Sequence, residues 1–226
     1  MSPSGAFVVV EGIDGAGKSA VCGGLCEVLA SAGREIVPVR EPGGTPEGEA
    51  IRTLLLEGTV GPFGPEAEAL MFNVARKRLV DTVIRPALGR GAVVVADRFS
   101  LSTLAYQTAA GADVDVVRRQ VGVARGDVSP DLTVLLDLPV DVAVERLRRA
   151  GAPPDRFEAE GRTIIESRRS AYLRFLEDEP GCRIVVDATR PVAKTVGDVL
   201  FHFGTGPPDA LPRPVAGGHE PVGFDP

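Results

Sequence analysis

The stretch "VVVEGIDGAGKSAV", residues 8–21, decides the fold of this 226-residue chain. An apolar run ends at Glu11, and a loop with three glycines leads to Lys18 and Ser19. Residues 12–19 match G-x-x-x-x-G-K-[ST], a loop that joins a buried strand to a helix and wraps around phosphate groups. Glycines let successive backbone N–H groups point at a phosphate, and the N-terminus of the helix adds its positive end. The stretch therefore predicts a nucleoside triphosphate site in an α/β protein.

The residues of this loop have separate predicted roles. Lys18 is expected to reach the β and γ phosphates, and the hydroxyl of Ser19 is expected to ligate Mg²⁺. The backbone around the phosphates is predicted to come from Gly12, Gly15, Ala16, Gly17 and Ala20. The alternative is a glycine-rich turn with an incidental lysine.

The rest of the chain alternates short apolar runs with longer helical patterns. The predicted strands are 6–10, 35–40, 92–97, 132–138 and 183–187. The predicted helices are 17–32, 46–57, 66–89, 100–109, 113–125, 140–150, 159–178 and 191–202. Continuous apolar runs are typical of parallel strands that are buried on both faces. The order predicts an α/β fold of the P-loop NTPase class, a five-stranded parallel sheet with helices on both faces.

The chain is predicted to form one domain, residues 1–203, followed by a tail. Residues 204–226 hold five glycines and six prolines in 23 positions, a composition that buries little surface and suits a mobile or loosely docked segment. The formal net charge is −6, which disfavours sequence-independent binding to nucleic acid. Three cysteines without CxxC spacing indicate a reduced, cytoplasmic protein. No basic leader or apolar stretch of about 20 residues points to export or to a membrane.

Three further sequence segments indicate which class of triphosphate-binding protein this is. "VREPGGT" (39–45) and "VVVADRFSLSTLAYQ" (93–107) each end a predicted strand, where doubly wound sheets bind ligands. "LMFNVARKRL" (70–79) places an aromatic ring and an arginine on one helical face. The guanine-reading N-K-x-D motif is absent, so a kinase for a small acceptor is favoured over a GTPase. Asp97 is expected to hold a magnesium-bound water or, alternatively, to cap the following helix.

Taken together, these motifs resemble the thymidylate kinase family. The resemblance covers nearly all of residues 6–203, through "EGIDGAGKS", "REPGGT", "LMFxxAR", "DRFxxSTxAYQ", "PDLTVLLD", "DRFE" and "DATRP". It implies a P-loop nucleoside monophosphate kinase that transfers the γ-phosphoryl group of ATP to dTMP, with Mg²⁺ as the cofactor. It also implies a homodimer.

The resemblance implies which residues hold the sugar and phosphate of the acceptor. Asp14 would accept a hydrogen bond from the sugar 3′-OH, and Tyr106 would press on the deoxyribose and disfavour a 2′-OH. Glu41 would lie near the sugar and the metal. Arg52 and Arg98 would hold the acceptor phosphate. The alternatives are a turn-stabilising role for the aspartate and surface ion pairs for the arginines.

The resemblance also implies a base pocket. Phe72 would stack on the base and Arg76 would donate to a thymine carbonyl, whereas Ser102 and Gln107 would line the pocket. Without the family, a phenylalanine on an apolar helix face is more often part of the core.

An arginine-rich lid is expected at about 147–161, within "ERLRRAGAPPDRFEAEG" (145–161). The P-loop carries no arginine, so the chain resembles the type that supplies a catalytic arginine from the lid. The candidates are Arg148, Arg149 and Arg156, of which Arg156 is favoured. Arg146 and Arg190 are expected near adenine. A solvated helix face is the alternative for each arginine.

The match departs from the family pattern at a few positions. Phe99 stands where the family commonly has Tyr, and "TAAGAD" (108–113) replaces a glycine-rich stretch. Both flank the predicted acceptor pocket, so a kinase for another or a modified pyrimidine monophosphate stays open. From a different class, a non-catalytic P-loop binding module is the second alternative.

Overall fold

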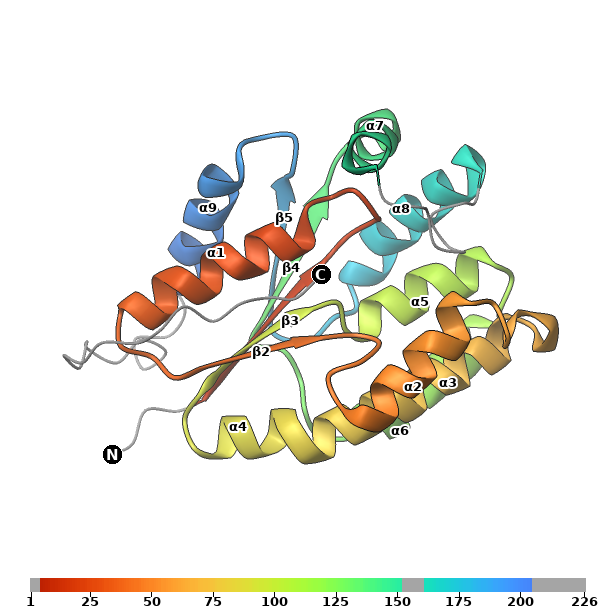
Figure 1. Ribbon diagram of the computed structural model, residues 1–226, viewed down its shortest axis with the longest axis horizontal. Coiled ribbons are helices and arrows are strands. Elements are labelled where there is room, and N and C mark those ends of the chain that lie inside the picture. Colours follow the sequence, from red (N-terminus) through yellow and green to blue (C-terminus); the bar gives the residue numbers. More distant parts are fainter. Residues whose placement is uncertain (1–4, 152–160, 205–226) are drawn as a thin grey trace.

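The computed structural model describes residues 5–151 and 161–204. Its sheet has the order β2-β3-β1-β4-β5, and all neighbouring strands are parallel. The strands are β1 (Ala6–Glu11), β2 (Ile36–Arg40), β3 (Val93–Asp97), β4 (Leu132–Asp137) and β5 (Cys182–Asp187). Figure 1 shows helices on both faces of this sheet. The predicted five-stranded parallel sheet is confirmed.

The helices follow the predicted positions closely. They are α1 (Lys18–Ser31), α2 (Pro46–Leu56), α3 (Pro65–Leu79), α4 (Arg85–Gly89), α5 (Ser100–Ala109), α6 (Val114–Arg125), α7 (Val140–Ala150), α8 (Arg162–Leu176) and α9 (Val192–Gly204). The predicted single helix over 66–89 is interrupted by a π-helical turn, η2 (Val80–Ile84), and a 3₁₀ turn, η1 (Gly61–Phe63), precedes α3. Pro86, the second residue of α4, has no N–H to donate, so the regular pattern of helical hydrogen bonds is broken there.

The central strands alternate their side chains between two apolar clusters. Val8 and Val10 of β1 belong to a cluster with α1 and α9, whereas Phe7 and Val9 belong to a second cluster with Leu79 and its neighbours. Successive side chains of a strand point to opposite faces, which explains the division. In Figure 1, α1 and α9 lie on one side of the sheet and α4 lies on the other.

The edge strands differ from the prediction that all strands are buried on both faces. Val185 in β5 is 52% exposed, and β2 is only partly buried along most of its length. These strands have a neighbour on one side only. Pro38 lies in β2, where an edge strand tolerates a residue without an N–H.

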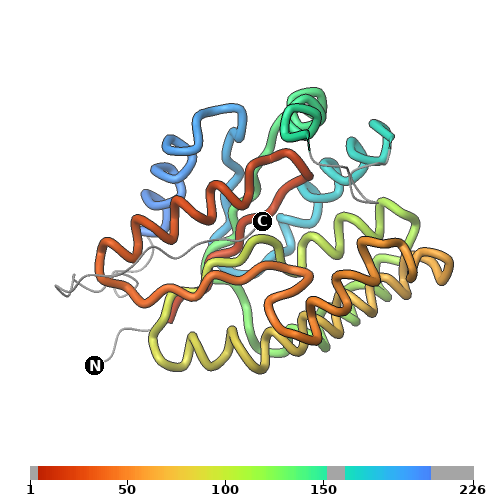
Figure 2. The backbone as a smooth tube through the Cα atoms, viewed as in Figure 1, coloured from red at the N-terminus to blue at the C-terminus, as the bar shows by residue number. Residues whose placement is uncertain are grey.

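The parallel arrangement brings the functional loops to one edge of the sheet. Val10 and Arg40 are both in register with Asp97, so the loops after β1, β2 and β3 begin side by side. Figure 2 shows the red first strand running through the middle of the fold, which gives its loop this central position. Within the described ranges, no helix combines the length and apolar composition needed to cross a bilayer.

Candidate active site

The loop after β1 has the backbone that a phosphate cradle requires. Gly15 has φ +79°, and a Cβ there would lie 2.4 Å from the carbonyl oxygen of Ala143. Gly17 has φ +90° and precedes the first residue of α1. Both positions therefore need glycine, one for close approach to α7 and both for the left-handed backbone. The loop delivers Lys18 to the N-terminus of α1.

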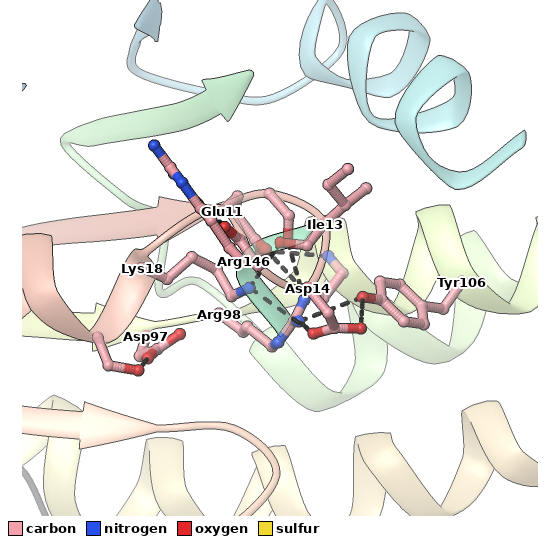
Figure 3. Close-up of polar contacts among 12 residues, drawn as sticks. Glu11, Ile13, Asp14, Lys18, Asp97, Arg98, Tyr106 and Arg146 are labelled. Carbon is pink, nitrogen blue, oxygen red and sulfur yellow. Dashed lines mark hydrogen bonds and ion pairs between the residues drawn. The ribbon is translucent and has the colours of Figure 1, made fainter. Parts of the chain in front are cut away.

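Lys18 is buried at the floor of the loop. Its Nζ donates to the carbonyl of Ile13 at 3.0 Å and lies 3.8 Å from Oδ1 of Asp14. Burial lowers the pKa of Lys18 and the nearby Arg98 guanidinium lowers it further, whereas Asp14 and other carboxylates oppose this. Figure 3 shows the ammonium inside the curl of the loop, near the position that phosphates occupy in a P-loop.

Ser19 and Asp97 form a pair that fits a magnesium ion. The Ser19 hydroxyl donates to Oδ2 of Asp97 at 2.6 Å, so a hydroxyl and a carboxylate oxygen already converge. Magnesium prefers oxygen ligands and is commonly bound by one or two protein groups together with substrate phosphates. The described ranges contain no group of three or more His, Cys, Asp or Glu side chains that would make a cage from protein ligands alone. The donor set therefore suits an ion that arrives with nucleotide phosphate.

A cavity of about 480 Å³ connects the P-loop to the helices on the acceptor side. It brings together most of the predicted site residues. Those that line it are Asp14, Gly15, Gly17, Lys18, Ser19, Ala20, Glu41, Arg52, Phe72, Arg76, Asp97, Arg98, Ser102, Tyr106, Gln107 and Arg146. Gly12 and Ala16 complete the loop: the Gly12 carbonyl accepts a hydrogen bond from Arg98, and the Ala16 N–H donates to Ile13.

Asp14 lies at the centre of a charged cluster in this cavity. It forms an ion pair with Arg98 and accepts a hydrogen bond from the Tyr106 hydroxyl at 2.6 Å (Figure 3). Burial alone would raise the pKa of Asp14, but Arg98, Lys18 and the Tyr106 hydroxyl outweigh it and lower the pKa to about 2. Asp14 is therefore ionised at neutral pH and able to accept a hydrogen bond from a ligand hydroxyl.

Glu41 and Arg76 form a buried pair beneath the predicted base pocket. The Nε of Arg76 donates to Oε2 of Glu41 at 2.8 Å, and further donors reach the Phe99 carbonyl at 3.1 Å and Thr103 Oγ1 at 2.9 Å. Burial raises the pKa of Glu41 to about 7, against the lowering effect of Arg76. The main contact of Glu41 in the structure is thus the side chain predicted to read the base.

The remaining acceptor-side residues have specific anchors. Arg52 donates to the Pro42 carbonyl at 3.0 Å, which holds it at the mouth of the "REPGGT" turn. Phe72 is partly buried and packs against the main core cluster. Gln107 is buried next to Glu68, with 3.5 Å between Nε2 and Oε2.

The structure places some of the arginines predicted for the lid and the adenine end at the cavity and others outside it. Arg146 is directed back to the P-loop region, where it donates to the Ala188 carbonyl at 2.8 Å and the Gly15 carbonyl at 3.5 Å. Arg148 and Arg149 lie outside the cavity lining, each 73% exposed and paired with Glu145 one turn earlier. Arg190 pairs with Asp198 on α9, also outside the lining. Arg156, the favoured catalytic arginine, lies outside the described residues.

Sequence reasoning missed three buried polar residues around the site. Glu11 accepts hydrogen bonds from the backbone N–H groups of Phe99 and Ser102 at 2.8 and 3.1 Å and from the Ser102 hydroxyl at 2.6 Å. Tyr172 lies 2.7 Å from Ser102 Oγ, and the Arg168 guanidinium carbon lies 4.2 Å from the centre of the Tyr106 ring. An acidic residue at the end of an apolar strand was a visible signal for Glu11. The two α8 residues stand outside the motifs.

The geometry joins a triphosphate loop to an anion- and hydroxyl-binding cluster, and similarity to known proteins now identifies the family. The family model for thymidylate kinase matches residues 10–199. The chain belongs to the thymidylate kinase family. Thymidylate kinase of Pseudomonas fluorescens (strain Pf0-1) is 43% identical over 192 residues, which cover 84% of this chain and 91% of that protein.

Relatives from other bacteria agree. Thymidylate kinase of Cereibacter sphaeroides (strain ATCC 17029 / ATH 2.4.9) is 44% identical over 194 residues, covering 84% of this chain and 89% of the relative. Thymidylate kinase of Bradyrhizobium diazoefficiens is 40% identical over 201 residues, covering 88% of each. The family is one of nucleoside monophosphate kinases, so the resemblance seen in the motifs is confirmed.

Proposed function

We propose that the protein transfers the γ-phosphoryl group of ATP to dTMP, giving dTDP and ADP. The observation that carries this proposal is the single cavity that joins Lys18 and Ser19 to the Asp14–Arg98–Tyr106 cluster. Phosphoryl transfer needs positioning and neutralisation of charge, and the acceptor phosphate is already anionic, so the protein needs no general base. A cavity lined by both sets of residues supplies these requirements.

The residues divide the work as follows. Lys18 leaves the Ile13 carbonyl to bind the donor phosphates, and Arg98 and Arg52 hold the acceptor phosphate. Asp14 orients the acceptor sugar, while Phe72, Arg76 and Gln107 hold the base. Mg²⁺ bound at Ser19, with Asp97 acting through water, would neutralise charge on the donor phosphates. Arg146 and Arg190 are assigned to the adenine end, and Arg148, Arg149 and Arg156 to the migrating phosphoryl group. To take these roles, Arg148 and Arg149 would have to leave Glu145, and Arg190 would have to leave Asp198.

We further propose that residues 1–203 form one kinase domain and that the enzyme is cytoplasmic and acts as a homodimer on small-molecule nucleotides, without nucleic acid or membrane. The exposed apolar side chains of α3 and α6 support the dimer. Leu70 and Val74 are 52% and 55% exposed on one face of α3, and Val123 on the adjacent α6 is 76% exposed. Large exposed apolar side chains on two packed helices favour a protein partner, which here is a second copy.

The departure at Phe99 bears on the alternative acceptors. The Phe99 ring is 1% exposed and packs edge-to-face on Phe7, with 5.0 Å between ring centroids. Phe99 also contributes to the lining of the cavity, and the guanidinium carbon of Arg76 lies 5.3 Å from the centroid of its ring. The relatives named thymidylate kinase favour dTMP over another pyrimidine monophosphate, and they favour a kinase over a non-catalytic module.

A coupled assay of ADP release tests the proposal. With ATP and Mg²⁺, dTMP should be the preferred acceptor over UMP, CMP and 5-substituted analogues. Lys18→Ala should lower kcat by about two to three orders of magnitude, because it removes a donor that stabilises charge in the transition state. Lys194→Ala, an exposed lysine on α9, is the matched control and should retain the parent kcat.

Two results would count against the proposal. Negligible turnover of dTMP beside rapid turnover of another nucleotide would reject the acceptor. Full activity of Lys18→Ala would reject the mechanism.

A further inference from the structure

Arg168 is a buried cation to which the proposed reaction assigns no role. It lies on α8 and is only 2% exposed. Its guanidinium carbon lies 4.2 Å from the centroid of the Tyr106 ring. Burying a charged group is costly unless its contacts compensate, and a desolvated cation over an aromatic face is the strong form of the cation–π interaction. The position of the Tyr106 ring is therefore coupled to Arg168.

The same helix makes a second contact with this ring. Tyr172 lies one turn after Arg168, so both side chains leave the same face of α8. The rings of Tyr106 and Tyr172 meet edge-to-face, with 6.2 Å between centroids and an interplanar angle of 83°. The hydroxyl of Tyr106 is held separately, since it donates to Asp14 at 2.6 Å and accepts from Arg98 at 3.2 Å (Figure 3). Thus Asp14 and Arg98 hold the hydroxyl, whereas the ring is held by Arg168 and Tyr172 of α8 together with Arg98, whose guanidinium carbon lies 5.1 Å from its centroid.

A small cavity lies behind the ring. Its volume is about 10 Å³, and its lining includes Asp14, Tyr106, Leu147, Ile165 and Arg168. This is about the volume of one water-sized probe, so the ring has almost no room to move back on this side, away from the large cavity, while Arg168 is in place. Replacing the guanidinium by a smaller group would enlarge this space on the side of the ring that faces α7 and α8.

We propose that Arg168 is a specificity-determining positioning residue that holds the Tyr106 ring against the acceptor sugar and thereby excludes ribonucleotides. The proposal rests on the proposed function for the identity of the acceptor and for the contact of Tyr106 with deoxyribose. A 2′-OH adds one oxygen atom at the place where the ring packs. A ring that can move back into the enlarged cavity accommodates that atom.

The test compares two acceptors that differ only in the 2′-OH, dTMP and 5-methyluridine monophosphate. Arg168→Met should lower the ratio of their kcat/KM values by about tenfold, in line with a lost buried cation–π contact. The change should come mainly from improved use of the ribonucleotide. Arg174→Met is the matched control, because Arg174 lies on the same helix with its guanidinium carbon 4.3 Å from the Phe175 ring. It is exposed at the surface, and its variant should keep the parent ratio.

A second measurement follows the ring without any turnover. The chain has two tyrosines and no tryptophan, so protein labelled with 3-fluorotyrosine should give two fluorine resonances, one each from Tyr106 and Tyr172. Tyr172→Phe assigns them. Arg168→Met should shift or broaden the Tyr106 resonance, whereas Arg174→Met should leave both in place. Arg168→Lys keeps the positive charge but lacks the planar guanidinium, so it should lower the ratio of kcat/KM for dTMP to that for 5-methyluridine monophosphate by about threefold. This variant replaces Arg168→Met in the test if the methionine variant fails to fold.

The outcomes separate this proposal from the proposed function. An unchanged sugar ratio and an unchanged Tyr106 resonance in the folded Arg168 variant overturn it. An equal fall in the ratio for Arg174→Met also overturns it. If the parent enzyme fails to phosphorylate dTMP, the proposed function is rejected, and the fluorine spectrum still decides whether Arg168 positions the ring.

Discussion

Asp14 illustrates how one residue of the loop serves both stability and binding. Within the motif pattern it is a variable position, yet in the structure it is the common partner of Arg98, Lys18 and Tyr106. Its low pKa means that the folded state holds the carboxylate more strongly in its charged form than the unfolded chain does. The cluster that would receive the acceptor sugar therefore also stabilises the fold.

This gives a pH dependence with a defined sign. The pKa of Asp14 falls from 3.8 to about 2 on folding. Its contribution to the free energy of unfolding is therefore fully present above pH 3.8 and is lost as the pH falls towards 2. Asp14→Asn should lower the free energy of unfolding by about 2 kcal/mol at pH 7. The difference in free energy of unfolding between the parent and Asp14→Asn, measured by denaturant titration, should become smaller below pH 4.

A surface aspartate provides the control for this prediction. Asp81→Asn removes a carboxylate from an exposed ion pair with Lys77. Its free energy of unfolding should stay close to that of the parent across the same pH range. A gap between parent and Asp14→Asn that stays constant down to pH 3 would contradict the assigned pKa.

At the scale of the element, α5 is capped from a distant strand. Its N-cap residue, Phe99, offers no side-chain cap, and the carboxylate of Glu11 at the end of β1 accepts the Phe99 and Ser102 N–H groups instead. Arg98, just before the helix, has φ +72°, a left-handed backbone that is strained for a residue with a side chain. The cap from β1 thus keeps the start of α5, and Arg98 with it, beside the phosphate loop.

Removing this cap should destabilise the protein. Glu11→Ala should lower the free energy of unfolding by roughly 3 kcal/mol, because buried N–H groups lose a charged acceptor. Glu11→Gln keeps an oxygen for the two N–H groups and should cost about 1 kcal/mol. Denaturant titration gives both values, and hydrogen exchange should show the loss concentrated in the first turn of α5. Equal losses for the two variants would contradict the role of the acceptor oxygen.

These contacts show which parts of the fold and of the site could be predicted from the sequence. The strands, the helices and the P-loop were predictable because each rests on patterns within a few residues. The bond from Glu11 to Phe99 joins positions 88 apart, and the stacking of Arg168 on Tyr106 joins two helices, so neither has a local signature. Conversely, the pairing of Arg148 and Arg149 with Glu145 follows helical spacing, and it explains why these arginines do not reach the cavity.

For the whole molecule, the exposed apolar face of α3 and α6 gives a test of assembly. Val74→Glu places a charge within that face and should convert the proposed dimer to a monomer, since an unpaired charge is costly in an apolar interface. Light scattering coupled to size-exclusion chromatography measures the change. Val28→Glu is the control, because Val28 is also exposed, at 46%, but lies on α1. A monomeric parent at every concentration would contradict the dimer.

The edges of the sheet restrict how copies of this chain can associate. An open edge strand can template the addition of a strand from another chain, which leads to uncontrolled growth. Pro38 in β2 interrupts the row of outward donors at one edge, and Arg183 in β5 adds a charge at the other. Strand-by-strand polymerisation is therefore discouraged at both ends of the sheet. Association through helical faces is not restricted in this way, and it would leave the carboxyl edge of the sheet, where the loops of the candidate site lie, accessible to substrate.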